Sequence, residues 1–348
     1  MRVNWGAAFQ IGAVYVGTIV GAGFATGKEI VEFFTQYGIH GLMGILISGT
    51  LFIWLGTKIM LIANRIQADS YKEFNEYLFG KKIALVVNIL MLLVLIGVTS
   101  VMLSGAGAVF EEQLGLSYQL GIFITIVLSI FILIFGVKGL FGVNMFVVPI
   151  MIFFSIVLVI EVAYREPTNI LYVTDEGARS FKWLISPFLY SAFNLAMAMP
   201  VLVPLAKEMK DEKIVKWGGL IGGGSLCLIL ITSHISLSAL PNVENYEIPM
   251  AEVMKNFMFT FYWLYILVIY GEIFTSVIGN LFGLERQIRN VVKVPSLLIV
   301  TGILTIAYFI SQLGYGSLIS FLYPLFGYVS LILVVLLARP IKNLPKRY

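Results

Sequence analysis

Long apolar runs separated by short polar connections make up almost the whole chain. A membrane-spanning helix needs about 20 predominantly apolar residues, and ten runs of that kind follow one another. The predicted spans cover residues 6–36, 39–63, 82–110, 118–136, 139–164, 180–207, 214–239, 257–283, 295–312 and 315–337. The pattern predicts an all-α membrane protein without a separate soluble domain.

Composition and charge agree with this prediction. The 348 residues are 59% hydrophobic and 12% charged, whereas soluble domains have about 25% charged residues. Most of the 23 Lys and Arg residues fall on one side of the predicted membrane, which predicts cytoplasmic termini, an even number of spans and a place in the cytoplasmic membrane. These basic residues lie between apolar runs, so they indicate orientation in the bilayer and not a nucleic-acid partner. The first span lacks a small-residue cleavage site and is expected to be retained.

Two connections are longer than the others. Residues 165–179 and residues 240–256 contain prolines and acidic residues, and both are expected to cap one face of the helix bundle. The first of them, expected to be extracellular, divides the chain into a five-helix half at residues 1–164 and a second half at residues 180–348.

A cluster of glycines interrupts the first predicted span at Gly17, Gly21, Gly23 and Gly27. Glycine in a helix interior costs about 1 kcal/mol relative to alanine, so the cluster predicts an open backbone near the middle of the bilayer. Such a break is tolerated only where protein or a wet cavity covers it, and it indicates the binding site of a secondary transporter.

If the two halves are repeats of opposite orientation, the sixth span is expected to be interrupted as well. This span contains Pro187, Pro200 and Pro204 around the polar segment from Tyr190 to Asn194, and each proline removes a backbone hydrogen bond. Prolines also occur in membrane helices as simple kinks, so both interpretations stay open for this span alone.

The eighth predicted span carries a candidate cation site. Hydroxyls of Thr275 and Ser276 can reach the carbonyl of Glu272, which brings three oxygens together. If the opened first helix adds the carbonyls of Gly17 and Val20, five neutral oxygens suit a hard monovalent cation. Ordinary helix packing is the alternative explanation of the Thr-Ser pair.

The glycine-rich stretch Gly17–Gly23, with its Gly21-Ala22-Gly23 break, and the Thr275-Ser276 pair resemble those of known transporters. The chain is similar over essentially its whole length to the LeuT-fold transporters of the amino acid, polyamine and organocation superfamily, and more narrowly to the YkvI-type bacterial membrane proteins. The resemblance implies ten transmembrane helices in a 5+5 inverted repeat with broken helices 1 and 6.

The resemblance also implies ligands for one sodium ion, which are Gly17, Val20, Glu272, Thr275 and Ser276. A second sodium site is not implied, because Phe24 follows the break where some members have Asn. Proton-coupled relatives carry a Lys inside the fifth helix, whereas Lys138 lies only at the end of this span. The first and sixth helices are expected to rock against a scaffold of the third, fourth, eighth and ninth.

A substrate site is expected at the same break. The backbone N–H groups around Gly21, Ala22, Gly23, Phe24 and Ala25 begin a new half-helix, whose positive end attracts a carboxylate. By resemblance, the remaining contacts come from Tyr190, Ser191, Phe193, Asn194 and Asn280, with Tyr190 or Phe193 as an aromatic lid. Packing is the alternative role for these aromatic side chains.

Several ionisable residues lie at membrane depth, where they are costly and usually face a cavity or a partner. Lys28 and Glu32 are spaced to pair on a helix surface, while Glu29 and Glu272 are candidates for a proton-carrying or gating role along with Lys28. His234 is interpreted either as a proton sensor or as a hydrogen-bonded packing residue.

No catalytic motif or cofactor motif occurs in the sequence, so it indicates a transport protein and not an enzyme. The expected function is sodium-coupled import of a small organic solute, an amino acid or related zwitterion, by alternating access. Its expected partners are the solute, Na⁺ as coupling ion and the lipid bilayer. Two alternatives stay open: a solute-binding sensor on the same fold without net transport, like the spore-germinant sensors, and a proton-coupled transporter that uses Glu29 or Glu272.

Overall fold

Helices form nearly all of the computed structural model, which describes residues 4–135, 140–165, 181–209, 211–289 and 292–338. The first half contains α1 (Trp5–Ile19), α2 (Ala22–Thr26), α3 (Lys28–Phe33), η1 (Thr35–Tyr37), α4 (Ile39–Leu51), η2 (Phe52–Gly56), α5 (Thr57–Ile66), α6 (Tyr71–Ala108), η3 (Val109–Gln113), α7 (Tyr118–Phe135) and α8 (Leu140–Arg165). The second half contains α10 (Lys182–Glu208), α11 (Glu212–Ser238), η6 (Val243–Asn245), α12 (Pro249–Phe257), η7 (Phe259–Phe261), α13 (Tyr262–Arg289), α14 (Ser296–Ser311) and α15 (Tyr315–Ala338).

The apolar runs of the sequence become these helices. Among the described residues, 6 helices are long and apolar enough to cross a membrane, and shorter apolar helices accompany them. Each predicted span contains at least one helix of the structure. The chain is therefore a multi-pass, all-helical membrane protein.

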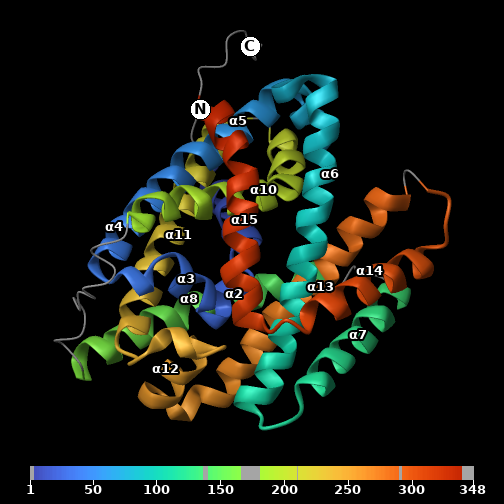
Figure 1. The fold of residues 1–348 in the computed structure, drawn as a ribbon. Coiled ribbons are helices and arrows are strands. Elements are labelled where there is room, and N and C mark those ends of the chain that lie inside the picture. The colour runs from blue at the N-terminus through green and yellow to red at the C-terminus, as the bar shows by residue number, and fades with distance from the viewer. Residues whose placement is uncertain (1–3, 136–139, 166–180, 210, 290–291, 339–348) are drawn as a thin grey trace.

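The helices pack in two groups. The first group, here called the bundle group, consists of α1, α4, α5, α10 and α11, and the second, the scaffold group, consists of α6, α7, α13 and α14. Figure 1 shows α7, α13 and α14 on one side of the molecule and α4 and α11 on the other. The helix α15 packs against α10 and α6 and so connects the two groups.

The first span is interrupted in the glycine cluster. The helix α1 ends at Ile19, Val20 and Gly21 are extended, and α2 begins at Ala22. A second interruption follows at Gly27, whose φ of 81° lies in the left-handed region that glycine adopts easily. The backbone therefore opens over two residues and then turns into α3.

The sixth span is not interrupted, so the prediction of a broken helix there is wrong. The helix α10 runs without a break from Lys182 to Glu208 and holds Pro187, Pro200 and Pro204 inside it. A proline leaves the carbonyl four residues before it without a donor, and none of these positions falls between Tyr190 and Asn194. The backbone ladder of the polar segment consequently stays intact.

One end of the molecule is covered by a lid, defined here as residues 240–257, which includes η6 and α12 (Figure 1). This matches the expectation that the second long connection caps the bundle. The other predicted cap, residues 165–179, lies outside the described residues apart from Arg165, the last residue of α8. The side chain of Lys28 holds the lid, because Nζ donates to the carbonyls of Glu244 and Tyr246, each at 2.7 Å.

Lys28 therefore has a different partner from the one predicted, and its pairing with Glu32 is wrong. Two more contacts fasten the same segment. The Glu112 carboxylate accepts the N–H groups of Glu247 and Ile248, the latter at 2.7 Å, and the Glu247 carboxylate accepts the N–H of Gly316 on α15. The lid is thereby tied to elements of both halves of the chain.

Candidate functional site

The break in the first span lies against α13. The hydroxyl of Ser276 is 3.7 Å from the position that a Cβ would take on Gly21, and α2 packs along α13. The neighbouring Thr275 is buried and its hydroxyl donates to the carbonyl of Glu272 at 3.2 Å. The fold thus brings the glycine break and the hydroxyl pair together from opposite halves of the chain.

Several oxygen atoms of the break and of α13 have no hydrogen-bond donor among the described residues. Among the described residues, no donor reaches the backbone carbonyls of Gly17 and Val20, because Gly21 and the residues after it have left the α1 ladder. The side chain of Glu272 is 1% exposed, and its Oε1 atom is also without a partner. Unpaired buried oxygens are costly, and an oxygen-preferring cation would satisfy them. The break and α13 therefore supply oxygen atoms of the kind that a sodium ion prefers.

The break is closed at the lid end. The hydroxyl of Tyr265 on α13 donates to the carbonyl of Ala25 at 3.4 Å. The hydroxyl of Tyr315 on α15 is hydrogen-bonded to Thr26 Oγ1 at 2.8 Å. These contacts tie α2 to α13 and to α15, which connects the two groups.

Away from the lid, both α1 and α13 carry exposed residues. On α13, Ser276 is half-buried and Gly279 is exposed, and a Cβ on Gly279 would meet nothing within 4 Å. On α1, the side chains of Phe9, Gln10 and Ala13 are exposed below the break. Exposed surface of α13 therefore begins within one helical turn of Ser276.

The start of α2 differs in one respect from the predicted anion site. The N–H groups of residues 21–24 have no acceptor among the described residues, as a helix start requires. A carboxylate of the protein already lies nearby, since Glu29 Oε2 is 2.5 Å from the position of a Cβ on Gly23. Only glycine at position 23 allows this approach.

Glu29 is the centre of a buried polar group formed with α10. Its side chain is 4% exposed, and its Oε1 atom accepts a hydrogen bond from Asn194 Nδ2 at 3.2 Å. The Tyr190 hydroxyl lies beside this carboxylate. Within the part of the chain that the structure describes, the Tyr190 hydroxyl has no hydrogen-bond partner other than this carboxyl group, and the buried Ser191 hydroxyl has none.

Aromatic rings surround this group. Phe193 packs against Tyr323 of α15 with ring centroids 4.7 Å apart, and Tyr323 also lies 3.3 Å from the Cβ position of Gly23. The sequence does not distinguish Tyr323 from the other aromatic residues of the last predicted span. The one sequence feature that marks this position is the neighbouring Pro324, which lies inside α15.

Other predicted residues lie apart from this group. Asn280 is half-buried on α13, one helical turn beyond Ser276. Phe24 is buried in α2. His234 Nδ1 is within 3.2 Å of Thr35 Oγ1, a contact that agrees with the packing interpretation of this histidine.

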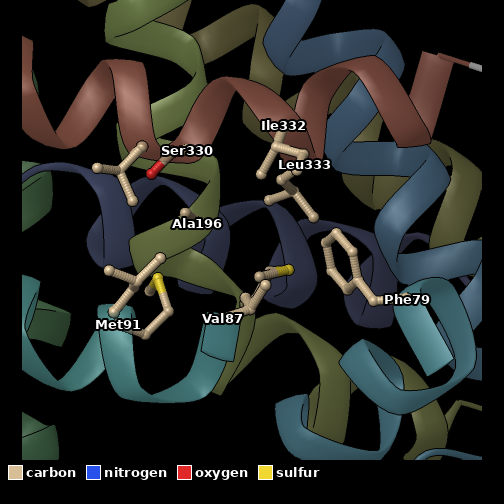
Figure 2. Close-up of a pocket in the computed structure, with 10 residues that line it drawn as sticks. Phe79, Val87, Met91, Ala196, Ser330, Ile332 and Leu333 are labelled. Atoms are coloured by element: carbon tan, nitrogen blue, oxygen red, sulfur yellow. The ribbon is translucent and has the colours of Figure 1, made fainter. Parts of the chain in front are cut away.

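A separate cavity lies between α6, α10 and α15. Figure 2 shows it lined by Phe79, Val87 and Met91 of α6, Ala196 of α10, and Ser330, Ile332 and Leu333 of α15. Its volume is about 30 Å³, and its lining is largely apolar. It lies apart from the residues of the candidate site.

Solved structures with a similar fold include membrane transporters. A mutant manganese transporter of Eremococcus coleocola superposes with a TM-score of 0.68 at 13% identity, covering 97% of this chain and 80% of that chain. The inward-facing conformation of Mhp1 gives a TM-score of 0.57 at 13% identity, covering 93% and 73%. These likenesses show that the chain has a LeuT-like fold.

Sequence comparison identifies closer relatives. The uncharacterized membrane protein YkvI of Bacillus subtilis (strain 168) is 53% identical over 332 residues, which cover 95% of this chain and 95% of that protein. The uncharacterized protein YyaD of the same organism is 24% identical over 341 residues, covering 97% and 98%. Residues 7–336 match the model of a family described as spore germination protein. With nearly its whole length matched, the chain belongs to the spore germination protein family.

Proposed function

We propose that the chain is a sodium-coupled symporter that imports a small organic solute, an amino acid or related zwitterion, across the cytoplasmic membrane. The observation that carries the proposal is the meeting of the α1 break with α13: Ser276 lies beside Gly21, and the carbonyls of Gly17 and Val20 lack a donor among the described residues. Five oxygens, from these two carbonyls and from Glu272, Thr275 and Ser276, would replace the hydration shell of one sodium ion.

The packing of the helices supports alternating access. The bundle group and the scaffold group each take helices from both halves of the chain, as an inverted 5+5 repeat of ten spans requires. In this proposal, the bundle group rocks against the scaffold group, and both termini lie in the cytoplasm. The contacts at the lid end and the exposed Gly279 favour a conformation open toward the cytoplasm.

Uptake into proteoliposomes tests the proposal. The full chain is reconstituted and loaded with choline chloride, and radiolabelled amino acids are supplied outside with sodium chloride or with choline chloride. We expect accumulation above the outside concentration only with an inward sodium gradient, and abolition by a sodium ionophore. Equal accumulation with both salts would contradict sodium coupling.

A second candidate is a solute sensor without net transport, which the family description as spore germination protein favours. A sensor would bind an amino acid in detergent and yet accumulate none in proteoliposomes under either gradient. Proton coupling is the third outcome, since Glu272 Oε1 is buried without a partner. In that case a pH gradient would drive accumulation when sodium is absent.

A further inference from the structure

The carboxyl group of Glu29 is buried, and the structure shows no positively charged partner for it among the described residues. The nearest candidate along the chain is Lys28, whose ammonium group is engaged by the carbonyls of Glu244 and Tyr246. The hydrogen bond to Glu29 comes from a neutral amide, that of Asn194. A buried charge is costly unless it is paired.

A tyrosine of α10 adjoins this carboxyl group. The Tyr190 hydroxyl is fully buried beside Glu29 and, among the described residues, has no hydrogen-bond partner other than that carboxyl group. The hydroxyl of Ser191, the next residue of α10, is buried without a partner in the same part of the chain. A buried carboxyl group with a tyrosine hydroxyl beside it is suited to a ligand with several N–H donors.

The aromatic surroundings favour the same kind of ligand. The rings of Phe193 and Tyr323 pack together, and Tyr323 adjoins Gly23, against which Glu29 lies. Tyr190 is itself packed against Phe33, Phe34 and Phe52. Aromatic faces attract cations more strongly where water is excluded.

We propose that Glu29, together with Asn194 and the hydroxyl of Tyr190, binds the ammonium group of the solute. The inference deepens the function proposed above and rests on it for the existence of a solute. It adds that a positively charged amino group is required, and it assigns to a side chain of the first span a role that the sequence leaves open. Any carboxylate of the solute would then lie near the free N–H groups of residues 21–24.

Thermal unfolding of the full chain in detergent tests this inference without transport. The probes are amino acids and simple primary amines, each paired with its N-acetyl form, which lacks the positive charge. We expect some free amines to raise the unfolding temperature and the N-acetyl forms to have no effect. Glu29→Gln should weaken the affinity for those amines at least tenfold, while Glu208→Gln, at an exposed position near the end of α10, should leave it unchanged.

A measurement on the wild-type chain covers the case in which Glu29→Gln does not fold. A hydrophobic carbodiimide modifies carboxyl groups in membrane proteins, and mass spectrometry locates the adduct on the peptide that contains Glu29. The same free amines should slow this modification, and their N-acetyl forms should not. Stabilisation by N-acetyl forms, the absence of any ammonium-dependent stabilisation, or unchanged affinity in Glu29→Gln would overturn the inference.

The result also separates this inference from the proposed function. If Glu29 carried only a proton, the neutral Glu29→Gln variant would keep its affinity for the amine. If amine binding depends on Glu29 but sodium gradients drive no uptake, the ammonium site stands and sodium symport fails. If sodium gradients drive uptake but no probe requires a charged amine, sodium symport stands and the ammonium site fails.

Discussion

The Nδ2 atom of Asn194 on α10 lies 3.2 Å from the Oε1 atom of Glu29 on α3. This hydrogen bond joins the interrupted first span to the continuous sixth span. Asn194 Nδ2 also donates to the carbonyl of Tyr190 at 3.1 Å, so one amide group links the Glu29 carboxyl group to the backbone of α10.

The first prediction concerns this contact. Asn194→Leu removes the amide donor from a buried carboxylate, so we expect a loss of about 1–3 kcal/mol in the free energy of unfolding. Denaturation in detergent measures it for Asn194→Leu, Glu29→Gln and the double variant. The double variant lacks the carboxyl group that needed the donor. Its loss in the free energy of unfolding should therefore be smaller than the sum of the losses in the two single variants. Strictly additive losses would contradict the coupling.

The second prediction concerns the close approach of Glu29 to the backbone. A Cβ on Gly23 would lie 2.5 Å from Glu29 Oε2 and 3.3 Å from the Tyr323 ring. Gly23→Ala should therefore displace the carboxylate and weaken the stabilisation by free amines at least tenfold. The control Gly302→Ala meets nothing within 4 Å and should gain up to about 1 kcal/mol from helix propensity. Unchanged amine binding in Gly23→Ala would count against the geometry of the site.

The third prediction concerns the lid. Lys28→Met keeps the length of the side chain but removes the donors to Glu244 and Tyr246, so the lid should loosen. Hydrogen exchange followed by mass spectrometry should show faster exchange in residues 240–248. Lys255→Met is the control, since the exposed Lys255 lies in the lid and forms an ion pair with Glu252 at 3.5 Å, and ion pairs at the surface contribute little. Equal exchange in both variants would contradict the role of Lys28.

The fourth prediction concerns orientation in the membrane. In a Cys227→Ala background, Asn245→Cys places an exposed thiol in the lid and Lys216→Cys places one near the start of α11. Because the basic residues predict cytoplasmic termini, a membrane-impermeant maleimide should label only Asn245→Cys in intact cells. Both variants should be labelled after permeabilisation. Labelling of Lys216→Cys alone in intact cells would reverse the orientation.

The positions of the spans could be predicted from the sequence because the bilayer imposes one length and one composition on every crossing helix. The break at Val20 and Gly21 could be predicted because the free-energy cost that a glycine adds to a helix depends mainly on that residue itself. The course of α10 could not, because the effect of a proline depends on which carbonyl it leaves unpaired. Pro187, Pro200 and Pro204 leave the ladder between Tyr190 and Asn194 untouched.

The partners of charged residues were least predictable from the sequence. Spacing along one helix suggests that Lys28 pairs with Glu32, whereas the folded chain supplies carbonyls more than 200 positions away, at Glu244 and Tyr246. The contact between Glu29 and Asn194 likewise depends on how α3 and α10 pack. Local spacing carries no information about such contacts.

Sodium-dependent stability tests the central claim, the cation site between the α1 break and α13, most directly. Thermal unfolding of the full chain in detergent is followed as sodium chloride replaces choline chloride at constant ionic strength. Binding at ten times the dissociation constant would stabilise the fold by about 1.4 kcal/mol. We predict that wild type and the control Thr301→Ala, exposed on α14, gain stability with sodium, whereas the double variant Thr275→Ala with Ser276→Ala does not. The same sodium response in the double variant as in wild type would contradict the account.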